Sequence, residues 1–358
     1  MKSFTFFFIF FTAILQAQFY ELQNKELAEY FEKIQLAEHA LINNELPVAH
    51  KWYNKAFANK KQPFAKDLYN SMLIAVKLKK RKSAYKNYTI LKCLQYPFSA
   101  DFLQKNFPDK YNSIPTKCNI ILDTVYKKKL DSLFQIDQHF RKLANGNLMN
   151  KKKEISESDS ITSAGLLKLI EIKGFPSEYE IGLSSTNGSL MQNFYLIIWH
   201  QMAMNHVSTQ KVNFSQKLID ALNNGKILPE HAAFLIDLNN GTSDFWLRHF
   251  TVFGFLTDNG TGESIREQII NESYKKDCCY IHSFYKSENI PADFQKKVDK
   301  VNENRKKIGI GTLKQAAESS IFSVNSPDYI LPQKMVEFPF VFGEEQMKMQ
   351  KAPLIKIQ

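Results

Sequence analysis

The sequence predicts a mostly α-helical protein with three parts: an N-terminal unit of helical hairpins, a compact helical domain and an extended C-terminal tail. Apolar residues recur at helical spacing through most of the chain. A central segment, residues 190–205, is apolar on nearly every side, as expected for a helix inside a core. The chain has 358 residues, of which 44% are hydrophobic, so it can form about two domains and bury a sizeable core.

The first 17 residues predict a secretory signal peptide. Lys2 precedes an uncharged run over residues 4–15, and Ala17 supplies the small residue expected before a cleavage point. Cleavage there leaves Gln18 first, and because no cysteine follows the cut, we expect no lipid anchor. The run is too short for a membrane span, and no later stretch is apolar enough for one. We therefore expect export to the periplasm or the extracellular space, with no membrane span in the mature chain.

Positive charge is concentrated early in the chain. The formal net charge is +11, and residues 51–92 hold twelve Lys or Arg but only one acid, Asp67. Such a face could meet phosphates, acidic glycans or an anionic membrane surface. The simpler interpretation is a solvated helix face. We expect an unknown protein or an anionic surface as the partner, and no nucleic acid.

The four cysteines allow three pairings in an exported protein. A bridge between Cys93 and Cys118 closes a modest loop and is the first expectation. Cys278 and Cys279 are adjacent, so a bridge between them would be strained, and two free buried thiols are an equal alternative. The cysteine spacing matches no zinc motif.

Residues 18–115 are expected to form the hairpin unit. Helices are predicted over residues 27–43, from Leu46 onward, from Pro63 onward and from Ser83 onward, with a turn-rich connector over residues 96–115. The offset from Leu27 to Pro63 is close to the period of about 34 residues of a tetratricopeptide repeat, which this unit loosely resembles. An ordinary pair of helical hairpins is the alternative.

Residues 119–320 are expected to form the helical domain, and residues 321–358 the extended tail. Helices are predicted over residues 119–145, 163–173, 190–205, 214–224, 229–237, 265–276 and 292–308. Residues 145–160 are polar and predict an exposed loop. Residues 245–256 predict a strand or an irregular buried segment. The tail contains four prolines with aromatic residues between them, so it should pack across the body or be partly disordered.

Polar residues stand beside the apolar faces of these helices in a recognisable order. The series comprises Asp137-Gln138-x-x-Arg141, Gly174-Phe-Pro176, His200, Leu228-Pro229 leading to Asp237, and Val301-Asn-x-x-Arg305-x-x-Ile308-Gly309. Its order and spacing over residues 130–313 resemble the bacterial family called domain of unknown function 6624. Phe175 stands where that family usually has Trp, and Leu238 where it has Arg. A Gln-x-Tyr-Gly-Thr segment is reduced to Gly254. The family name implies no reaction.

Asp137, Arg141, His200 and Asp237 form the candidate polar centre, supported by Gln138, Gly174, Pro176 and Arg305. Buried charges are costly unless paired, so we expect the first four side chains to meet. In one interpretation they form a structural network in which His200 donates to Asp237. In the other, His200 is a general acid or base tuned by Asp137 or Asp237, and Arg141 binds an anionic group of a ligand.

No catalytic or cofactor motif accompanies this centre. The chain has no Gly-x-Ser-x-Gly, no glycine-rich phosphate loop and no His-Glu-x-x-His. His200 and His206 lie six residues apart, which does not place both on one helix face, so we expect no metal and no cofactor. The leading hypothesis is a non-catalytic exported protein that binds a partner through its helical hairpins. The alternative is an enzyme of unknown reaction that uses the polar centre.

Overall fold

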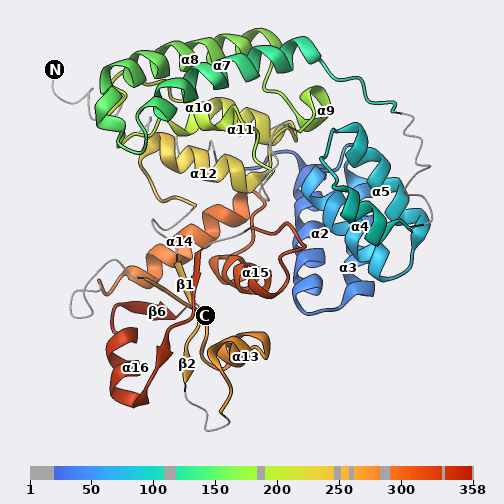
Figure 1. The fold of residues 1–358 in the computed structure, drawn as a ribbon, viewed down its shortest axis with the longest axis vertical. Helices are drawn as coiled ribbons and strands as arrows, with labels where there is room; N and C mark the ends of the chain where they lie inside the picture. Colours follow the sequence, from blue (N-terminus) through green and yellow to red (C-terminus); the bar gives the residue numbers. More distant parts are fainter. Residues whose placement is uncertain are drawn as a thin grey trace, which may run out of the picture.

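The computed structural model describes residues 20–108, 118–183, 190–245, 251–257, 262–282, 291–332 and 335–356. The expected signal peptide lies outside these residues. The protein is mostly helical, as the sequence predicts, with a few short strands near its C-terminal end (Figure 1). None of the helices in the described ranges is both long enough and apolar enough to cross a membrane.

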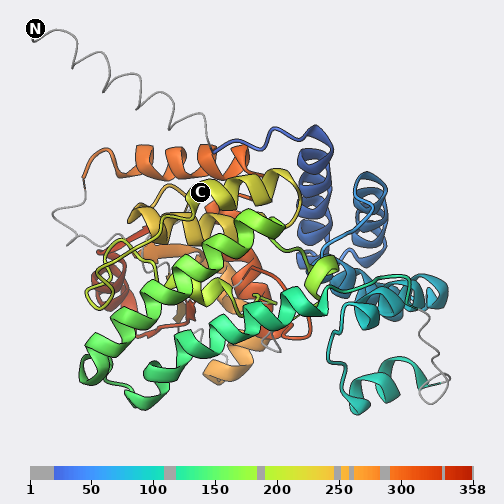
Figure 2. The same ribbon diagram turned by 90° about the horizontal axis from the view of Figure 1, so that it is seen from above.

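Four helices form two hairpins at one side of the molecule (Figures 1 and 2). Asn24 caps the first helix by accepting a hydrogen bond from the backbone N–H of Leu27, and Pro47 occupies the first turn of the second. The four predicted helices are thus confirmed, although the fourth begins at Arg81 and Ser83 lies inside it, and the connector holds an additional short helix, α6. The bounds are α2 Lys25–Ile42, α3 Leu46–Asn59, α4 Ala65–Lys77, α5 Arg81–Cys93 and α6 Ala100–Asn106.

The hairpin unit packs on the rest of the chain through α2 and α4. Residues 65–75 of α4 are all buried. Inside this contact, the Asn70 amide group donates to the carbonyl of Ile330 at 2.7 Å and accepts from its N–H at 2.9 Å. The side chain of Gln35 in α2 likewise donates to the carbonyl of Gly309 at 2.9 Å. The inner face of the hairpins is therefore covered by the protein's own body, and α3 and α5 face outward.

The central part of the molecule is a second group of helices. In both views α7 and α8 lie side by side (Figures 1 and 2), and Figure 1 shows α10, α11 and α12 beneath them. Their apolar faces join those of the hairpins in one large core. The bounds are α7 Thr124–Leu143, η2 Leu148–Lys151, α8 Lys152–Lys173, α9 Glu178–Ile181, α10 Tyr195–Trp199, α11 Ser215–Asn223 and α12 Pro229–Asn240.

The prediction of an exposed loop over residues 145–160 is wrong. Helix α8 begins at Lys152, and Ile155, Ser158, Asp159 and Thr162 recur at helical spacing on its buried side. Three of these four residues are polar, so the hydrophobic pattern does not reveal the buried face. Small hydroxyl groups and a paired carboxylate can be buried when each finds a hydrogen-bond partner. Here the Ser158 and Thr162 hydroxyls donate to backbone carbonyls.

The helix expected over residues 190–205 is much shorter than predicted. Only Tyr195–Trp199 forms α10, and turns precede and follow it. Leu190 has a φ of 52°, a left-handed conformation that no helix continues through. Because apolar turns can fill a core as well as a helix can, burial of this segment did not require helix throughout.

Short strands and helices form the C-terminal part. Among the described residues, strands β4, β1, β3 and β6 make one sheet in that order, in which β1 pairs parallel with β4 and antiparallel with β3. A second small core lies here. The bounds are β1 Thr251–Phe253, β2 Leu256–Thr257, α13 Ile265–Ile270, η3 Ser273–Asp277, β3 Tyr280–His282, α14 Phe294–Lys307, α15 Leu313–Asn325, β4 Met335–Glu337, β5 Phe340–Val341, α16 Gly343–Lys351 and β6 Leu354–Lys356.

The tail is thus more ordered than an extended segment. Its strands β4, β5 and β6 add to β1, β2 and β3, and α16 lies between β5 and β6. Strands of two or three residues are too short for an alternating pattern to identify them. Pairing with distant partners, which a local pattern cannot report, therefore decides the structure of the tail.

Both pairs of cysteines are bridged. The expected disulfide between Cys93 and Cys118 is confirmed, with a Cα–Cα distance of 5.4 Å. Cys278 and Cys279 are joined to each other, so the alternative of two free thiols is not realised.

Candidate functional site

The polar centre begins with a hydrogen-bonded pair, Asp137 and His200. Asp137 lies on the buried side of α7, and His200 ends α10. His200 Nδ1 lies 2.9 Å from Asp137 Oδ1, and the carboxylate has no exposed surface whereas 19% of the imidazole is exposed. A carboxylate at Nδ1 favours the tautomer that carries its proton there, which leaves Nε2 as an acceptor. Within the described ranges, no group bonds to Nε2.

Arg141 joins this pair to a second acid, Asp159 of α8. Its two terminal nitrogens donate to the two Asp159 oxygens at 2.6 and 2.7 Å, a bidentate contact. Arg141 also donates to the backbone carbonyl of Asp137 at 3.0 Å, and Gln138 donates to the Asp137 carboxylate at 2.7 Å. The hydroxyl of Ser208 donates to Asp159. The centre therefore fixes α7, α8 and α10 relative to one another.

Asp237 does not lie at the polar centre, where Asp159 is the second acid bound by Arg141. The expectation that His200 donates to Asp237 is wrong, because His200 bonds to Asp137 instead. The Asp237 carboxylate accepts from the Thr242 hydroxyl at 2.9 Å and from the backbone N–H groups of Asp244 and Phe245 at 2.8 and 3.1 Å. Burial raises its pKa to about 6, against the effect of these bonds. Asp237 thus holds the turn that follows α12.

Arg305 binds the same segment from α14. Arg305 is 1% exposed, and its guanidinium donates to the carbonyls of Phe245 at 3.1 Å and Gly311 at 2.6 Å. Burial lowers its pKa to about 10. Gly174 and Pro176 are also structural: Gly174, with a φ of 80°, ends α8, and the buried Pro176 follows it. Of the four supporting residues, only Gln138 therefore lies at the polar centre.

Sequence reasoning missed Asp159 because it falls in the segment expected to be a loop. Asp137, Asp159 and His200 together offer three ligand atoms within 4.8 Å of one another, which a metal ion could use. Arg141, however, already provides a positive charge bound to Asp159 and 3.5 Å from Asp137. A divalent cation would have to displace this guanidinium, so the geometry favours the ion-pair network over a metal centre.

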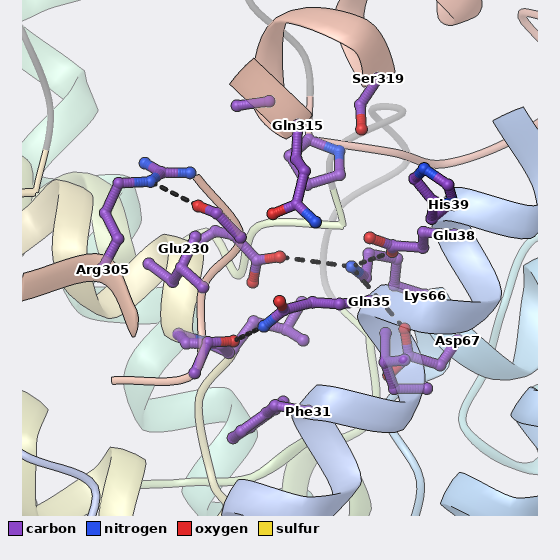
Figure 3. A pocket seen from close by; sticks show the side chains of 18 of the residues that line it. Phe31, Gln35, Glu38, His39, Lys66, Asp67, Glu230, Arg305, Gln315 and Ser319 are labelled. Carbon is purple, nitrogen blue, oxygen red and sulfur yellow. Dashed lines mark hydrogen bonds and ion pairs between the residues drawn. The ribbon is translucent and has the colours of Figure 1, made fainter. Parts of the chain in front are cut away.

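A second cluster of buried charges lies where α2 and α4 meet α12, around Lys66 (Figure 3). The Lys66 ammonium lies 2.7 Å from Glu38, 3.4 Å from Glu230 and 3.7 Å from Asp67. The adjoining cavity has a volume of about 40 Å³, enough for a few waters but not for an organic ligand. The cluster therefore fastens the hairpins to the central helices rather than forming a binding site.

The environment of this cluster shifts the protonation of its members. Burial raises the pKa of Glu38 to about 7, although the Lys66 charge opposes the change. Burial also works to lower the pKa of Lys66, but the three carboxylates outweigh it and raise this pKa well above its usual value. Nearby, burial raises the pKa of Glu178 to about 7, and this carboxyl accepts from the backbone N–H of Ala65 at 2.8 Å.

The exposed positive charge of the hairpins is concentrated in residues 51–92, and we call its part on α3 and α5 the α3–α5 face. Of the twelve Lys and Arg in residues 51–92, ten are exposed, while the single acid, Asp67, is 1% exposed. Lys80, just before α5, lies near enough to His50 of α3 for its charge to add to burial in lowering the His50 pKa. The exposed charge of this segment is therefore entirely positive. The exposed cations are Lys51, Lys55, Lys61, Lys77, Lys79, Lys80, Arg81, Lys82, Lys86 and Lys92.

Comparison with protein-family models, with curated proteins and with solved structures gave no match for this chain. The resemblance to domain of unknown function 6624 therefore stays a prediction.

Proposed function

We propose that this protein is an exported binding protein that attaches to a surface of closely spaced negative charges through its α3–α5 face. The observation that carries this proposal is the burial of Asp67, the one acid of the basic segment, while ten cations remain exposed. A face of one sign attracts a polyanion over a distance of about 8–10 Å at ordinary salt concentrations.

The packing of the hairpins supports a binding surface on their outward side rather than on their inner side. In a tetratricopeptide-type arrangement, the inner helices α2 and α4 would offer the groove. Here that side is occupied by Ile330 and Gly309 of the same chain. Among the described residues, α3 and α5 therefore offer a partner a side of the hairpins that the body does not cover. The basic start and uncharged run of residues 1–17 support export.

A four-lysine variant tests the proposal. Lys51→Gln, Lys55→Gln, Lys82→Gln and Lys86→Gln together remove four exposed charges from α3 and α5. Each basic residue near an anionic membrane contributes about 1 kcal/mol, so vesicles rich in anionic lipid should bind this variant about a thousandfold more weakly. Sedimentation with anionic and with neutral vesicles, and retention on an acidic polysaccharide, distinguish a lipid from a glycan as the source of charge.

A matched control removes the same charge elsewhere. Lys128, Lys129, Lys142 and Lys153 are exposed on α7 and α8, where Asp131 and Glu154 also lie. Changing those four lysines to Gln should leave binding within about twofold of the wild type, because the acids there already weaken the local field. Equal losses in the two variants, or no binding to either polyanion, would contradict the proposal.

A second candidate function, acid–base catalysis at His200, is favoured by one observation. The buried Asp137 orients the imidazole through Nδ1, the His200 side chain keeps 19% of its surface exposed, and no group of the described residues bonds to Nε2. Arg141 is already in a bidentate contact with Asp159, so the protein's own carboxylate takes the place in which an anionic ligand was expected. If His200 acts chemically, a folded His200→Gln variant should reproduce the phenotype of a gene deletion. A folded variant with wild-type phenotype would remove this candidate.

A further inference from the structure

A second cavity, whose lining shares no residue with the polar centre or with the exposed cations of residues 51–92, lies between the end of α2, helix α15 and the η3–β3 segment. Its volume is about 440 Å³, within the range of about 300–1,000 Å³ that is usual for small-molecule sites. We propose that this cavity binds a small organic anion with an apolar body. The proposal is independent of the function proposed above, because none of the four lysines substituted there lines the cavity.

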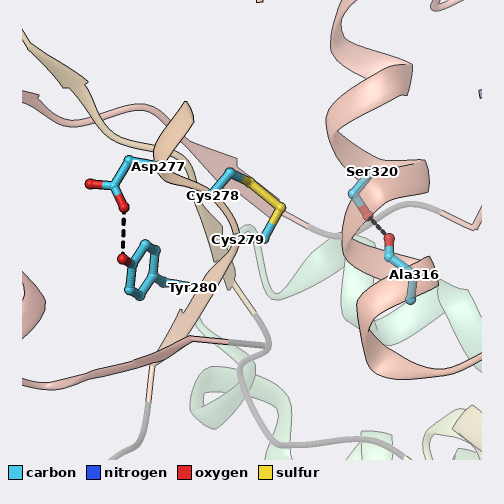
Figure 4. The surroundings of a disulfide bond; sticks show 6 residues. All are labelled: Asp277, Cys278, Cys279, Tyr280, Ala316 and Ser320. Carbon is cyan, nitrogen blue, oxygen red and sulfur yellow. Dashed lines mark hydrogen bonds between the residues drawn. A yellow bond between two sulfur atoms is a disulfide. The ribbon is translucent and has the colours of Figure 1, made fainter. Parts of the chain in front are cut away.

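Part of the cavity lining is apolar. It comprises the Cys278–Cys279 disulfide together with Ile42, Ile321 and Phe322, which come from different sides of the cavity. Figure 4 shows the disulfide beside Asp277 and Tyr280, with the α15 turn that holds Ala316 and Ser320 across from it. A disulfide is polarisable and has no hydrogen to donate, so it offers an occupant dispersion contacts. These apolar side chains suit a flat, apolar part of a ligand that lies between them.

The charges around the cavity are unevenly paired. Lys275 and Glu272 form an ion pair at 2.5 Å and neutralise each other. Lys314, Lys356 and Glu318 also line the cavity, and within the described residues no ion pair engages any of these three. Among the described residues, the lining therefore contains two unpaired cations and one unpaired acid. Its net charge is positive even when His39 is counted as neutral.

These two features together define the ligand class. The apolar body would lie against the disulfide and Phe322, and a carboxylate, sulfonate or phosphate group would be held by Lys314 and Lys356. Exposed ion pairs are individually weak, so we expect the two lysines together to give about a threefold to tenfold gain in affinity for an anion. Glu318 repels the same group and limits that gain.

The charge of the probe is the first part of the test. Anilinonaphthalene sulfonate has an aromatic body and one negative charge, and phenylnaphthylamine has the same body without the charge. Fluorescence titration of the full chain should show saturable one-to-one binding of the sulfonate, with the neutral probe at least about threefold weaker. Equal affinity for the two probes, or binding without saturation, would overturn the proposal.

Substitutions at the rim of the cavity are the second part of the test, and they should change the affinity for the probe in opposite directions. Lys314→Gln with Lys356→Gln should weaken sulfonate binding about threefold to tenfold, whereas Glu318→Gln should strengthen it about twofold to fivefold. Lys296→Gln with Lys306→Gln removes the same charge from exposed positions on α14 and should change nothing. All substituted residues lie at least partly at the surface, so the variants should fold. Unchanged affinity in the three rim substitutions would place the probe elsewhere and overturn the proposal.

Discussion

Replacing Arg141 with Ala should lower the free energy of unfolding by about 3–5 kcal/mol. The substitution leaves the Asp137 and Asp159 carboxylates, neither of which has exposed surface, without the guanidinium that neutralises them. An uncompensated buried charge is costly because the protein interior solvates it poorly. Urea unfolding followed by circular dichroism at neutral pH measures the change.

Two further variants sharpen this test. Arg141→Lys keeps the charge but loses the bidentate geometry on Asp159, so its cost should lie between those of wild type and Arg141→Ala. Lys142→Ala, at the next and exposed position of α7, should change stability by less than about 0.5 kcal/mol. If Arg141→Ala costs no more than Lys142→Ala, the network does not hold α7 to α8.

Replacing Lys66 with Met should also cost about 3–5 kcal/mol, and here the cost should depend on pH. At pH 8 the variant leaves Glu38, Asp67 and Glu230 without their shared cation. At pH 5 Glu38, with a pKa raised to about 7, is already protonated, so one of these charges is absent and the loss should be smaller.

The direction in which the stability of the wild type changes with pH follows from the pKa values of its buried carboxyl groups. Glu38 and Glu178 have folded-state pKa values of about 7, above the ordinary 4.5, so the folded state binds protons more tightly than the unfolded chain. Their contribution to stability is fully present below about pH 4.5 and is lost as the pH rises through 7. Unfolding free energies at pH 5 and pH 8, with the exposed Lys61→Met as control, measure both effects. A cost for Lys66→Met that is the same at the two pH values would contradict this account.

The hairpin helices could be predicted from sequence because their core residues are apolar and regularly spaced. Helix α2 is an example: Phe31, Ile34, Ala37 and Leu41 follow helical spacing and are buried. Helix α8 could not be predicted in the same way, because its buried side carries Ser158, Asp159 and Thr162. Local hydrophobic patterns identify apolar faces and overlook buried faces that are built from paired polar groups.

The candidate site was predictable in part for a related reason. Asp137 and Arg141 lie four apart on one helix, so their proximity follows from helix geometry. That His200 meets Asp137 rather than Asp237 depends on how α7, α10 and α12 pack, which no local spacing encodes. One local feature of the sequence points to the Lys66 cluster, namely the single acid Asp67 among twelve cations. Glu230 lies far away along the chain, so its part in the cluster could not be predicted.

Lysine acetylation, read out by mass spectrometry in the presence and absence of the anionic vesicles, tests the central claim most directly. The α3–α5 face predicts that Lys51, Lys55, Lys82 and Lys86 become protected when vesicles are added, while Lys128 and Lys153 on α7 and α8 react as before. Protection that falls on α7 and α8 and leaves the α3–α5 lysines reactive would contradict the account.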